Sequence, residues 1–155
     1  MKTNFQKIYI TIGCPGSGKS TYYKEHYIND SSIIYISSDT IRKELLGSED
    51  NQSNGNIVFN TLYNRVYSEL ISNNSIYVDA CFINCKARKQ IMKILKKYHN
   101  IKIIALVFNV GLGELIDRDS KRERSVGKDI IKKFFDRKIQ DTVSIEEGFD
   151  DIIYI

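Results

Sequence analysis

The stretch TIGCPGSGKST, residues 11–21, has the spacing of a phosphate-binding loop. Its part GCPGSGKS fits the pattern GxxxxGK followed by Ser or Thr, and it lies between a predicted strand and a predicted helix, as that pattern requires. Glycines let the backbone turn tightly, so that N–H groups can surround a polyanion. The pattern predicts that Lys19 reaches the β and γ phosphates of ATP and that Ser20 binds Mg²⁺. The predicted ATP-binding residues of the loop are Gly13, Pro15, Gly16, Ser17, Gly18, Lys19, Ser20 and Thr21.

Asp39 and Arg42 stand three residues apart at the predicted start of a helix, directly after a second apolar run. Side chains at this spacing lie on one helix face. If the phosphate acceptor is an alcohol, Asp39 is placed to accept its proton and Arg42 to bind an anionic group of the same acceptor. The structural alternative is an N-capping aspartate that pairs with an arginine one turn later.

Asp79 ends the apolar segment IYVDA, which has the form of a strand with a Walker B aspartate. Such an aspartate steadies Mg²⁺ or its water shell, so Ser20 and Asp79 are the predicted metal residues. The alternative is an aspartate that only forms a turn at the end of a strand.

Arg118 and Arg122 stand four residues apart on a predicted helix in the segment RDSKRERS. Phosphoryl transfer spreads negative charge over the γ-phosphate oxygens, and a mobile segment that delivers arginine stabilises this charge and excludes water. We therefore expect a lid over about residues 114–127, with both arginines on the donor phosphates. The alternative is an exposed helix face on which neighbouring acidic residues pair with these arginines.

Apolar runs and helical patterns alternate along the chain, which predicts βαβ units, an α/β fold and a mostly parallel sheet. The ligand of such a sheet lies at the carboxyl ends of its strands. Ser38 or Asp39 is the expected cap of the second helix, which Gly47 closes, and Asn84 is the expected cap of the fourth. The predicted strands cover residues 7–13, 32–37, 75–80, 102–108 and 150–155, and the predicted helices cover residues 19–29, 38–47, 57–72, 84–99, 113–124 and 128–140.

The charge is unevenly distributed along the chain. Lys and Arg outnumber Asp and Glu by 16 to 6 over residues 86–138, whereas residues 139–155 hold five acidic residues and no basic one. A local positive field favours polyanionic partners, although single lysines also serve as the solvated face of a helix. The three cysteines form no CxxC pair, and no apolar run is long enough for a signal peptide or a membrane span. We therefore expect a soluble, cytoplasmic protein with no membrane contact.

The whole set of motifs resembles the kinase domain of the phage-type 5′-polynucleotide kinases, within the P-loop kinase superfamily. The resemblance is carried by TIGCPGSGKST, by DTIR after the second strand, by VDA and by RDSKRERSVGKDIIKKFF. It implies a single P-loop kinase domain over residues 1–155. This domain would hold a central, mostly parallel sheet of four or five strands in the order 2-3-1-4-5, flanked by helices and completed by a helical lid.

The resemblance also implies an activity, namely transfer of the γ-phosphate of ATP to the 5′-hydroxyl of an RNA or DNA end. Asp39 would be the general base and Arg42 would contact the adjacent phosphate of the acceptor. Lys19 and Ser20 would hold ATP with Mg²⁺, and Arg122, with Arg118, would act on the donor phosphates. Two alternatives stay open: a kinase of a small molecule, nucleotide or sugar nucleotide, as in the zeta-toxin-like kinases, and an ATP-binding module without catalysis. The sequence does not indicate an oligomeric state.

Overall fold

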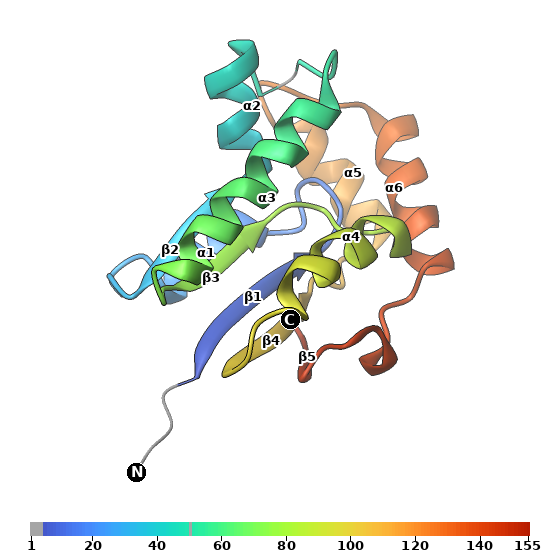
Figure 1. Cartoon of the computed structure of the whole chain (residues 1–155). Coiled ribbons are helices and arrows are strands. Elements are labelled where there is room, and N and C mark those ends of the chain that lie inside the picture. Colours follow the sequence, from blue (N-terminus) through green and yellow to red (C-terminus); the bar gives the residue numbers. More distant parts are fainter. Residues whose placement is uncertain (1–4, 50) are drawn as a thin grey trace.

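The computed structural model describes residues 5–49 and 51–155. Strands and helices alternate along the described part of the chain, and the helices of residues 112–120 and 128–140 lie side by side (Figure 1). The strands are β1 (Gln6–Ile12), β2 (Ile33–Ser37), β3 (Ser75–Asp79), β4 (Ile101–Val107) and β5 (Asp151–Tyr154). The helices are α1 (Lys19–His26), α2 (Ser38–Leu46), α3 (Gly55–Ile71), α4 (Cys85–Leu95), α5 (Leu112–Ser120) and α6 (Lys128–Gln140), with a short 3₁₀ helix at Ile145–Glu147.

The five strands form one sheet in the order β2-β3-β1-β4-β5, and all four neighbouring pairs are parallel. The α/β fold, the strand order and the parallel sheet predicted from the sequence are therefore confirmed. Since all strands run the same way, their carboxyl ends lie along one edge, which carries the loops that follow β1, β3 and β4 and the start of α2 directly after β2.

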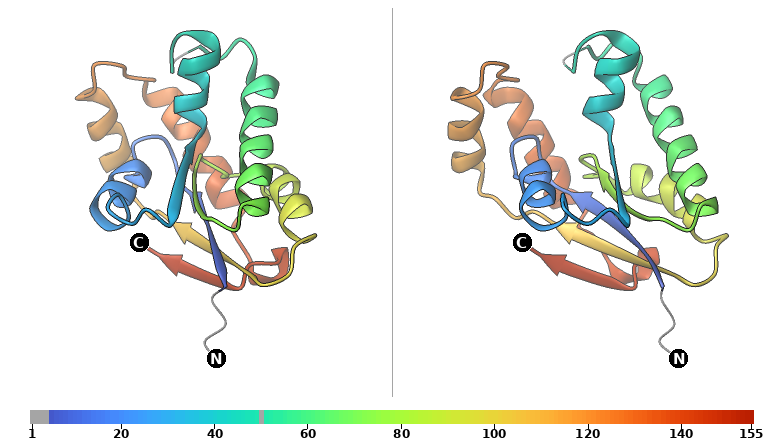
Figure 2. Two further views of the ribbon diagram at one scale, coloured as in Figure 1. Left: turned by 60° about the vertical axis from the view of Figure 1, so that its left-hand side comes forward. Right: turned by 90° about the vertical axis from the view of Figure 1, so that its left-hand side faces the viewer.

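Each face of the sheet has its own apolar layer, and the helices on the two faces lie on opposite sides in Figure 2. Helices α3 and α4 pack against one face, where Val58, Leu62, Val66 and Leu70 are buried. This confirms the amphipathic helix predicted from their spacing, and each such side chain contributes roughly 1.5–3 kcal/mol by its burial. The face beneath α1 is lined by aromatic rings, among them Tyr9 and Tyr77.

A third apolar cluster joins α5 to α6 and is built around Cys14, Leu115 and Ile131. Because Cys14 lies in the phosphate loop, this cluster also joins α5 and α6 to that loop. Helix α5 ends at Ser120 rather than at residue 124, so the lid is helical only in its first part and Arg122 follows the helix.

Two other helices end earlier than predicted, α1 at His26 rather than residue 29 and α4 at Leu95 rather than residue 99, and one predicted cap is wrong. The cap of α2 is Ser37, whose Oγ accepts a hydrogen bond from the Thr40 N–H, and not Ser38 or Asp39. Gly47 closes α2 with a φ of 81°, and Asn84 caps α4 by accepting from the Ala87 N–H, both as expected. In residues 5–49 and 51–155, no helix combines the length and the apolar character that crossing a membrane would need.

Candidate active site

The loop between β1 and α1 is rich in glycines, and its backbone geometry depends on them. Gly16 and Gly18 have φ angles of 79° and 98°, a region that side chains disfavour. Gly13 is constrained by packing instead, because a Cβ atom there would lie 2.5 Å from Ser17 Oγ and 3.0 Å from Phe108 Cβ. Ser17 Oγ is buried and has no hydrogen-bond partner among the described residues. The loop thus offers an unused hydroxyl as well as backbone N–H groups, which suits a phosphate.

Lys19 begins α1 and turns its side chain back over the loop. Its Nζ donates hydrogen bonds to the carbonyl oxygens of Gly13 at 3.3 Å and Cys14 at 2.8 Å. The Tyr77 hydroxyl of β3 donates a hydrogen bond to the Lys19 carbonyl oxygen at 2.7 Å, which anchors the start of α1 to the sheet. The ammonium group therefore lies at the mouth of the loop, where phosphate oxygens could replace the two carbonyls.

Asp39 and Arg42 lie in the first turns of α2, at the end of β2. Their side chains form the ion pair named above as the structural alternative, with 3.2 Å between Arg42 Nη1 and Asp39 Oδ1. The two partners differ in exposure: the Asp39 side chain is 65% exposed and the Arg42 side chain only 9%. Arg42 Nε is buried without a hydrogen-bond partner in the described part of the chain. An exposed carboxylate beside a partly unsatisfied guanidinium can take both a proton and an anion.

Asp79 ends β3 as predicted, on the same sheet face as Tyr35 of β2. Its Oδ2 accepts a hydrogen bond from the Tyr35 hydroxyl. Burial raises the pKa of Asp79 above its ordinary value, while the Lys19 ammonium and the Tyr35 hydrogen bond act to lower it. Burial and the Asp79 charge raise the pKa of Tyr35, so this phenol keeps its proton and acts as a donor.

Cys81 lies two residues after Asp79, in the segment next to the phosphate loop. Burial raises the pKa of the Cys81 thiol, and the charges of Lys19, Asp39, Asp79 and Arg42 all act on it. The carbonyl oxygen of Cys81 accepts a hydrogen bond from the Gly13 N–H, which ties the segment after β3 to the phosphate loop. No role was predicted for this cysteine, although its place directly after the strand that ends in Asp79 indicates a position near the site.

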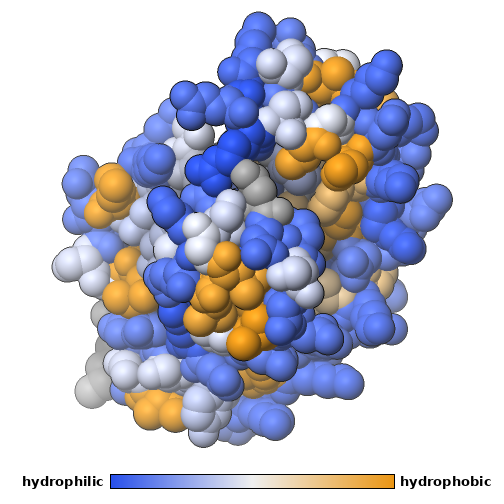
Figure 3. Space-filling model, turned by 90° about the horizontal axis from the view of Figure 1, so that it is seen from above, coloured by the Kyte–Doolittle hydropathy of each residue, from blue (hydrophilic) through white to orange (hydrophobic). Residues whose placement is uncertain are grey.

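Polar and charged side chains cover most of the face seen from above, and apolar side chains form separate patches on it (Figure 3). The order β2-β3-β1 of these parallel strands brings the ends that carry Asp39, Asp79 and the phosphate loop next to one another, at one edge of the sheet.

Both lid arginines approach the phosphate loop at Gly16. Arg118 Nη1 donates to the Gly16 carbonyl oxygen at 3.2 Å, and its Nη2 pairs with Glu114 one turn earlier at 2.5 Å. Arg122 Nη1 lies 4.0 Å from the position that a Cβ atom on Gly16 would take. Arg118 thus meets the phosphate loop and also forms the i, i+4 pair of an exposed helix face, whereas its contact with donor phosphates stays a prediction.

Asp119 is the reason why Arg122 lies outside the helix. This carboxylate is buried, with 2% of the residue exposed, and it accepts hydrogen bonds from Ser125 Oγ at 2.6 Å, Val126 N at 3.0 Å and Gly127 N at 2.9 Å. These bonds pull the chain back towards α5 and end the helix early. Burial acts to raise the pKa of Asp119, but the three hydrogen bonds outweigh it and the pKa falls below its ordinary value.

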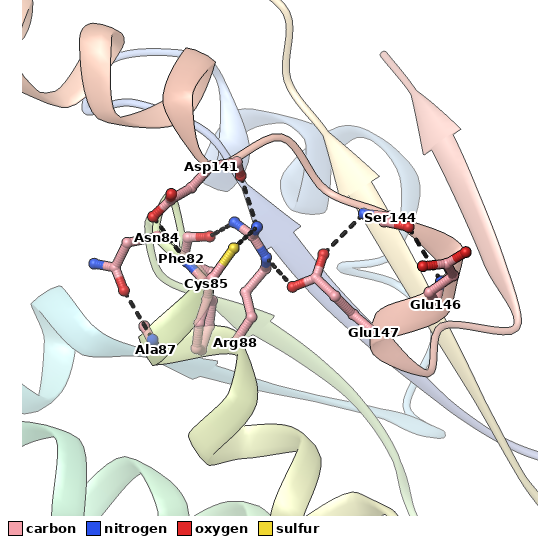
Figure 4. A network of polar contacts seen from close by, with 9 residues as sticks. All are labelled: Phe82, Asn84, Cys85, Ala87, Arg88, Asp141, Ser144, Glu146 and Glu147. Atoms are coloured by element: carbon pink, nitrogen blue, oxygen red, sulfur yellow. Dashed lines mark hydrogen bonds and ion pairs between the residues drawn. The ribbon is translucent and has the colours of Figure 1, made fainter.

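Arg88 fixes the segment between β3 and α4, which follows the candidate site (Figure 4). The residue is fully buried. Its guanidinium donates to Glu147 Oε1 at 2.8 Å, to the Phe82 carbonyl at 2.9 Å and to the Asp141 carbonyl at 2.7 Å. Arg88 belongs to the basic region of residues 86–138, yet it shares a helix face with apolar Ile91, and this spacing indicates its burial.

The residues present fit ATP and Mg²⁺. Ser20 is exposed at the start of α1, and Asp79 supplies a carboxylate, so the oxygen donors suit a hard cation that keeps waters and phosphate oxygens as its other ligands. No group of three or more His, Cys, Asp or Glu side chains in residues 5–49 and 51–155 could hold a metal by itself. A metal here would therefore depend on phosphate oxygens, as in other nucleotide sites.

Solved structures with the same fold include nucleic-acid and small-molecule kinases. A chain of the Pnkp1/Rnl/Hen1 RNA repair complex has a TM-score of 0.77 and 22% identity, over 95% of this chain and 47% of that one. A fungal RNA kinase has a TM-score of 0.69 and 19% identity, over 98% of this chain and 38% of that one. The present chain thus spans less than half the length of these two.

A gluconokinase from Sinorhizobium meliloti 1021 has a TM-score of 0.59 and 14% identity, over 98% of this chain and 83% of that one. At these identities the similarity shows a shared P-loop kinase fold. A model of the AAA domain family AAA_33 matches residues 8–139, which include the phosphate loop, α2, the end of β3 and the lid. The chain therefore belongs to the AAA_33 family of AAA domains.

Proposed function

We propose that this chain is a kinase that transfers the γ-phosphate of ATP to the 5′-hydroxyl of an RNA or DNA end. The observation that carries the proposal is the placement of Lys19, the Asp39–Arg42 pair and Asp79 at the carboxyl ends of the neighbouring strands β1, β2 and β3, with Arg118 hydrogen-bonded to Gly16 of the phosphate loop. A site that only held a nucleotide would have no use for an exposed carboxylate paired with a buried guanidinium. The two RNA-processing proteins of the same fold add support.

In this proposal Asp39 accepts the proton of the attacking 5′-hydroxyl, and Arg42 binds the next phosphate of the acceptor strand. The hydroxyl oxygen bonds to the γ-phosphorus while the bond to the β–γ bridging oxygen breaks, and ADP leaves. Lys19, Arg118 and Arg122 stabilise the charge on the transferred group. Mg²⁺, held through Ser20 and Asp79, would neutralise part of the phosphate charge when bound.

The proposal extends to the whole chain as one P-loop kinase domain and to a cytoplasmic location. The three cysteines are all free, which suits a reducing compartment. Cell fractionation would check this location.

A small-molecule kinase is the second candidate, because the chain spans 83% of the S. meliloti gluconokinase and 84% of a shikimate kinase from Acinetobacter baumannii with the same fold. The deciding experiment incubates the protein with labelled ATP, Mg²⁺ and separate acceptors: 5′-hydroxyl RNA and DNA strands, nucleoside monophosphates, sugars and sugar nucleotides. The proposal expects label on the 5′-hydroxyl strands. Label only on a small acceptor would favour the second candidate.

The Asp39→Asn variant separates a kinase from a module that only binds ATP. Removal of a general base lowers the rate of transfer by about 10² to 10⁴-fold, whereas ATP affinity should stay close to that of the parent protein. The matched control is Glu44→Gln on the same helix, since Glu44 pairs with Arg65 on the surface. An Asp39→Asn protein that transfers phosphate as fast as the parent would remove Asp39 from the mechanism.

A further inference from the structure

Helix α4 carries an exposed row of lysines. Lys86, Lys89 and Lys93 are all exposed and lie on one side of the helix, opposite the buried Arg88 and Ile91. Their spacing of three and four residues places neighbours one turn apart. We call these three lysines the α4 basic face; Lys97, in the turn after the helix, continues it.

The α4 basic face differs from α5 and α6 because its three lysines have no acidic partner within residues 5–49 and 51–155. Lys121 pairs with Asp117 at 2.9 Å, and Lys132 pairs with Asp136 at 2.7 Å, each four residues apart. In contrast, α4 contains no acidic residue, and no ion pair joins its three exposed lysines to the described part of the chain.

This arrangement is unfavourable for the isolated fold. Like charges one turn apart repel each other, and a lysine in the first turn also meets the positive end of the helix dipole. Lys86 lies in that first turn. The three lysines therefore do not stabilise the folded protein by themselves. A bound polyanion would reduce both kinds of repulsion.

The position of α4 connects the row to the candidate site. The helix begins a few residues after Asp79, at the edge where the catalytic groups meet, and runs away from that edge. Arg88 holds its first turn to Phe82 and to the C-terminal segment, so the lysines stand on a fixed support (Figure 4). A strand whose 5′ end lies at Asp39 could continue along this helix.

We propose that the α4 basic face binds the backbone phosphates of a single-stranded nucleic acid downstream of its reacting 5′ end. This inference rests on the proposed polynucleotide acceptor and adds a second contact outside the reaction site. The face offers ammonium groups alone, so it recognises phosphates and not bases. It predicts a preference for strands long enough to reach α4.

The test compares the parent with a triple variant, Lys86→Gln, Lys89→Gln and Lys93→Gln. A 3′-labelled single strand of about a dozen nucleotides with a free 5′-hydroxyl is titrated by fluorescence anisotropy at several salt concentrations. Each phosphate neutralised on a single strand contributes about −0.7 to the slope of log K against log salt, so three contribute about −2. Between about 50 and 200 mM salt the parent should lose about 20-fold more affinity than the triple variant.

The control variant removes three charges elsewhere, through Lys24→Gln, Lys102→Gln and Lys132→Gln, and should keep the salt slope of the parent. Melting temperatures check folding, and the α4 variant should melt at the same temperature as the parent or higher, because repulsion is removed. An unchanged slope and affinity in a folded α4 variant would overturn the proposal.

Phosphorylation of a 5′-hydroxyl dinucleotide separates this proposal from the proposed function. A dinucleotide is too short to reach α4, so both proteins should phosphorylate it equally, whereas the α4 variant should show a higher KM for the long strand alone. If the parent phosphorylates no 5′-hydroxyl strand, the proposed function fails, and the anisotropy titration still decides whether α4 binds nucleic acid.

Discussion

Replacement of Asp119 by asparagine tests how the lid is held over the phosphate loop. The carboxylate of Asp119 accepts three hydrogen bonds from residues 125–127, and its own carbonyl oxygen accepts one from the Arg122 N–H at 3.1 Å. Asparagine keeps one acceptor oxygen, and its NH₂ group then faces an N–H donor. At least one charge-assisted bond is lost, which is worth about 1.5–3 kcal/mol.

The substitution should destabilise the lid more than the sheet, because α5 and α6 pack through a cluster separate from the two sheet faces. A loss of about 2 kcal/mol changes the ratio of closed to open lid by about 30-fold. We therefore expect nucleotide affinity to fall by up to about 30-fold. Trypsin should also cut faster after Lys121, Arg122 and Arg124. A titration with a fluorescent ATP analogue and a digestion time course measure these two effects.

The effect should depend on pH in a defined direction. The pKa of Asp119 is lowered in the folded protein, so its stabilising contribution is complete above the unfolded pKa of about 3.9 and is lost as the pH falls through the folded value. Between pH 5 and 8 the parent should therefore be more stable than the Asp119→Asn variant by about 2 kcal/mol. In stronger acid the two proteins should become equally stable.

The matched control for Asp119 is Asp117→Asn on the same helix. The Asp117 side chain is 61% exposed and pairs with Lys121, so its loss should cost at most about 1 kcal/mol. If Asp119→Asn binds nucleotide as tightly as Asp117→Asn and resists trypsin equally, Asp119 does not hold the lid.

Two further substitutions test the support of the site. Gly13→Ala places a Cβ atom 2.5 Å from Ser17 Oγ, so the free energy of unfolding should fall by about 1–3 kcal/mol and nucleotide binding should be lost, whereas Gly55→Ala, with open space around it, should keep both. Arg88→Met leaves buried acceptors without donors and should cost about 3–5 kcal/mol in urea unfolding, against about 0.5 kcal/mol or less for the exposed Lys89→Met. Equal urea midpoints for the two Met variants would contradict the role given to Arg88.

The strands were predictable because their apolar runs are short, rich in β-branched residues and separated by helical patterns. The order of the five strands followed from the resemblance to P-loop kinases rather than from the runs themselves. The meeting of Lys19, Asp39 and Asp79 followed from the rule that parallel strands end at one edge.

The features that could not be predicted depend on contacts between distant residues. The sequence pattern continues α5 to residue 124, but the bonds from Asp119 to residues 125–127 compete with the helix and end it at Ser120. The cap of α2 was misplaced by one residue, since three serine and aspartate residues in a row are all capable caps. The burial of Arg88 was not predicted, because its acceptors come from chain segments that the local pattern does not reveal.

The aromatic layer beneath α1 gives the protein an optical signal of its own. The chain has ten tyrosines and no tryptophan, so no tryptophan fluorescence masks the fluorescence of the tyrosines. Six of the ten gather around the helix that follows the phosphate loop, namely Tyr9, Tyr22, Tyr23, Tyr27, Tyr35 and Tyr77. Since Tyr77 also touches the first residue of that helix, movement of the loop on nucleotide binding should alter the emission, and binding can be followed without any added label.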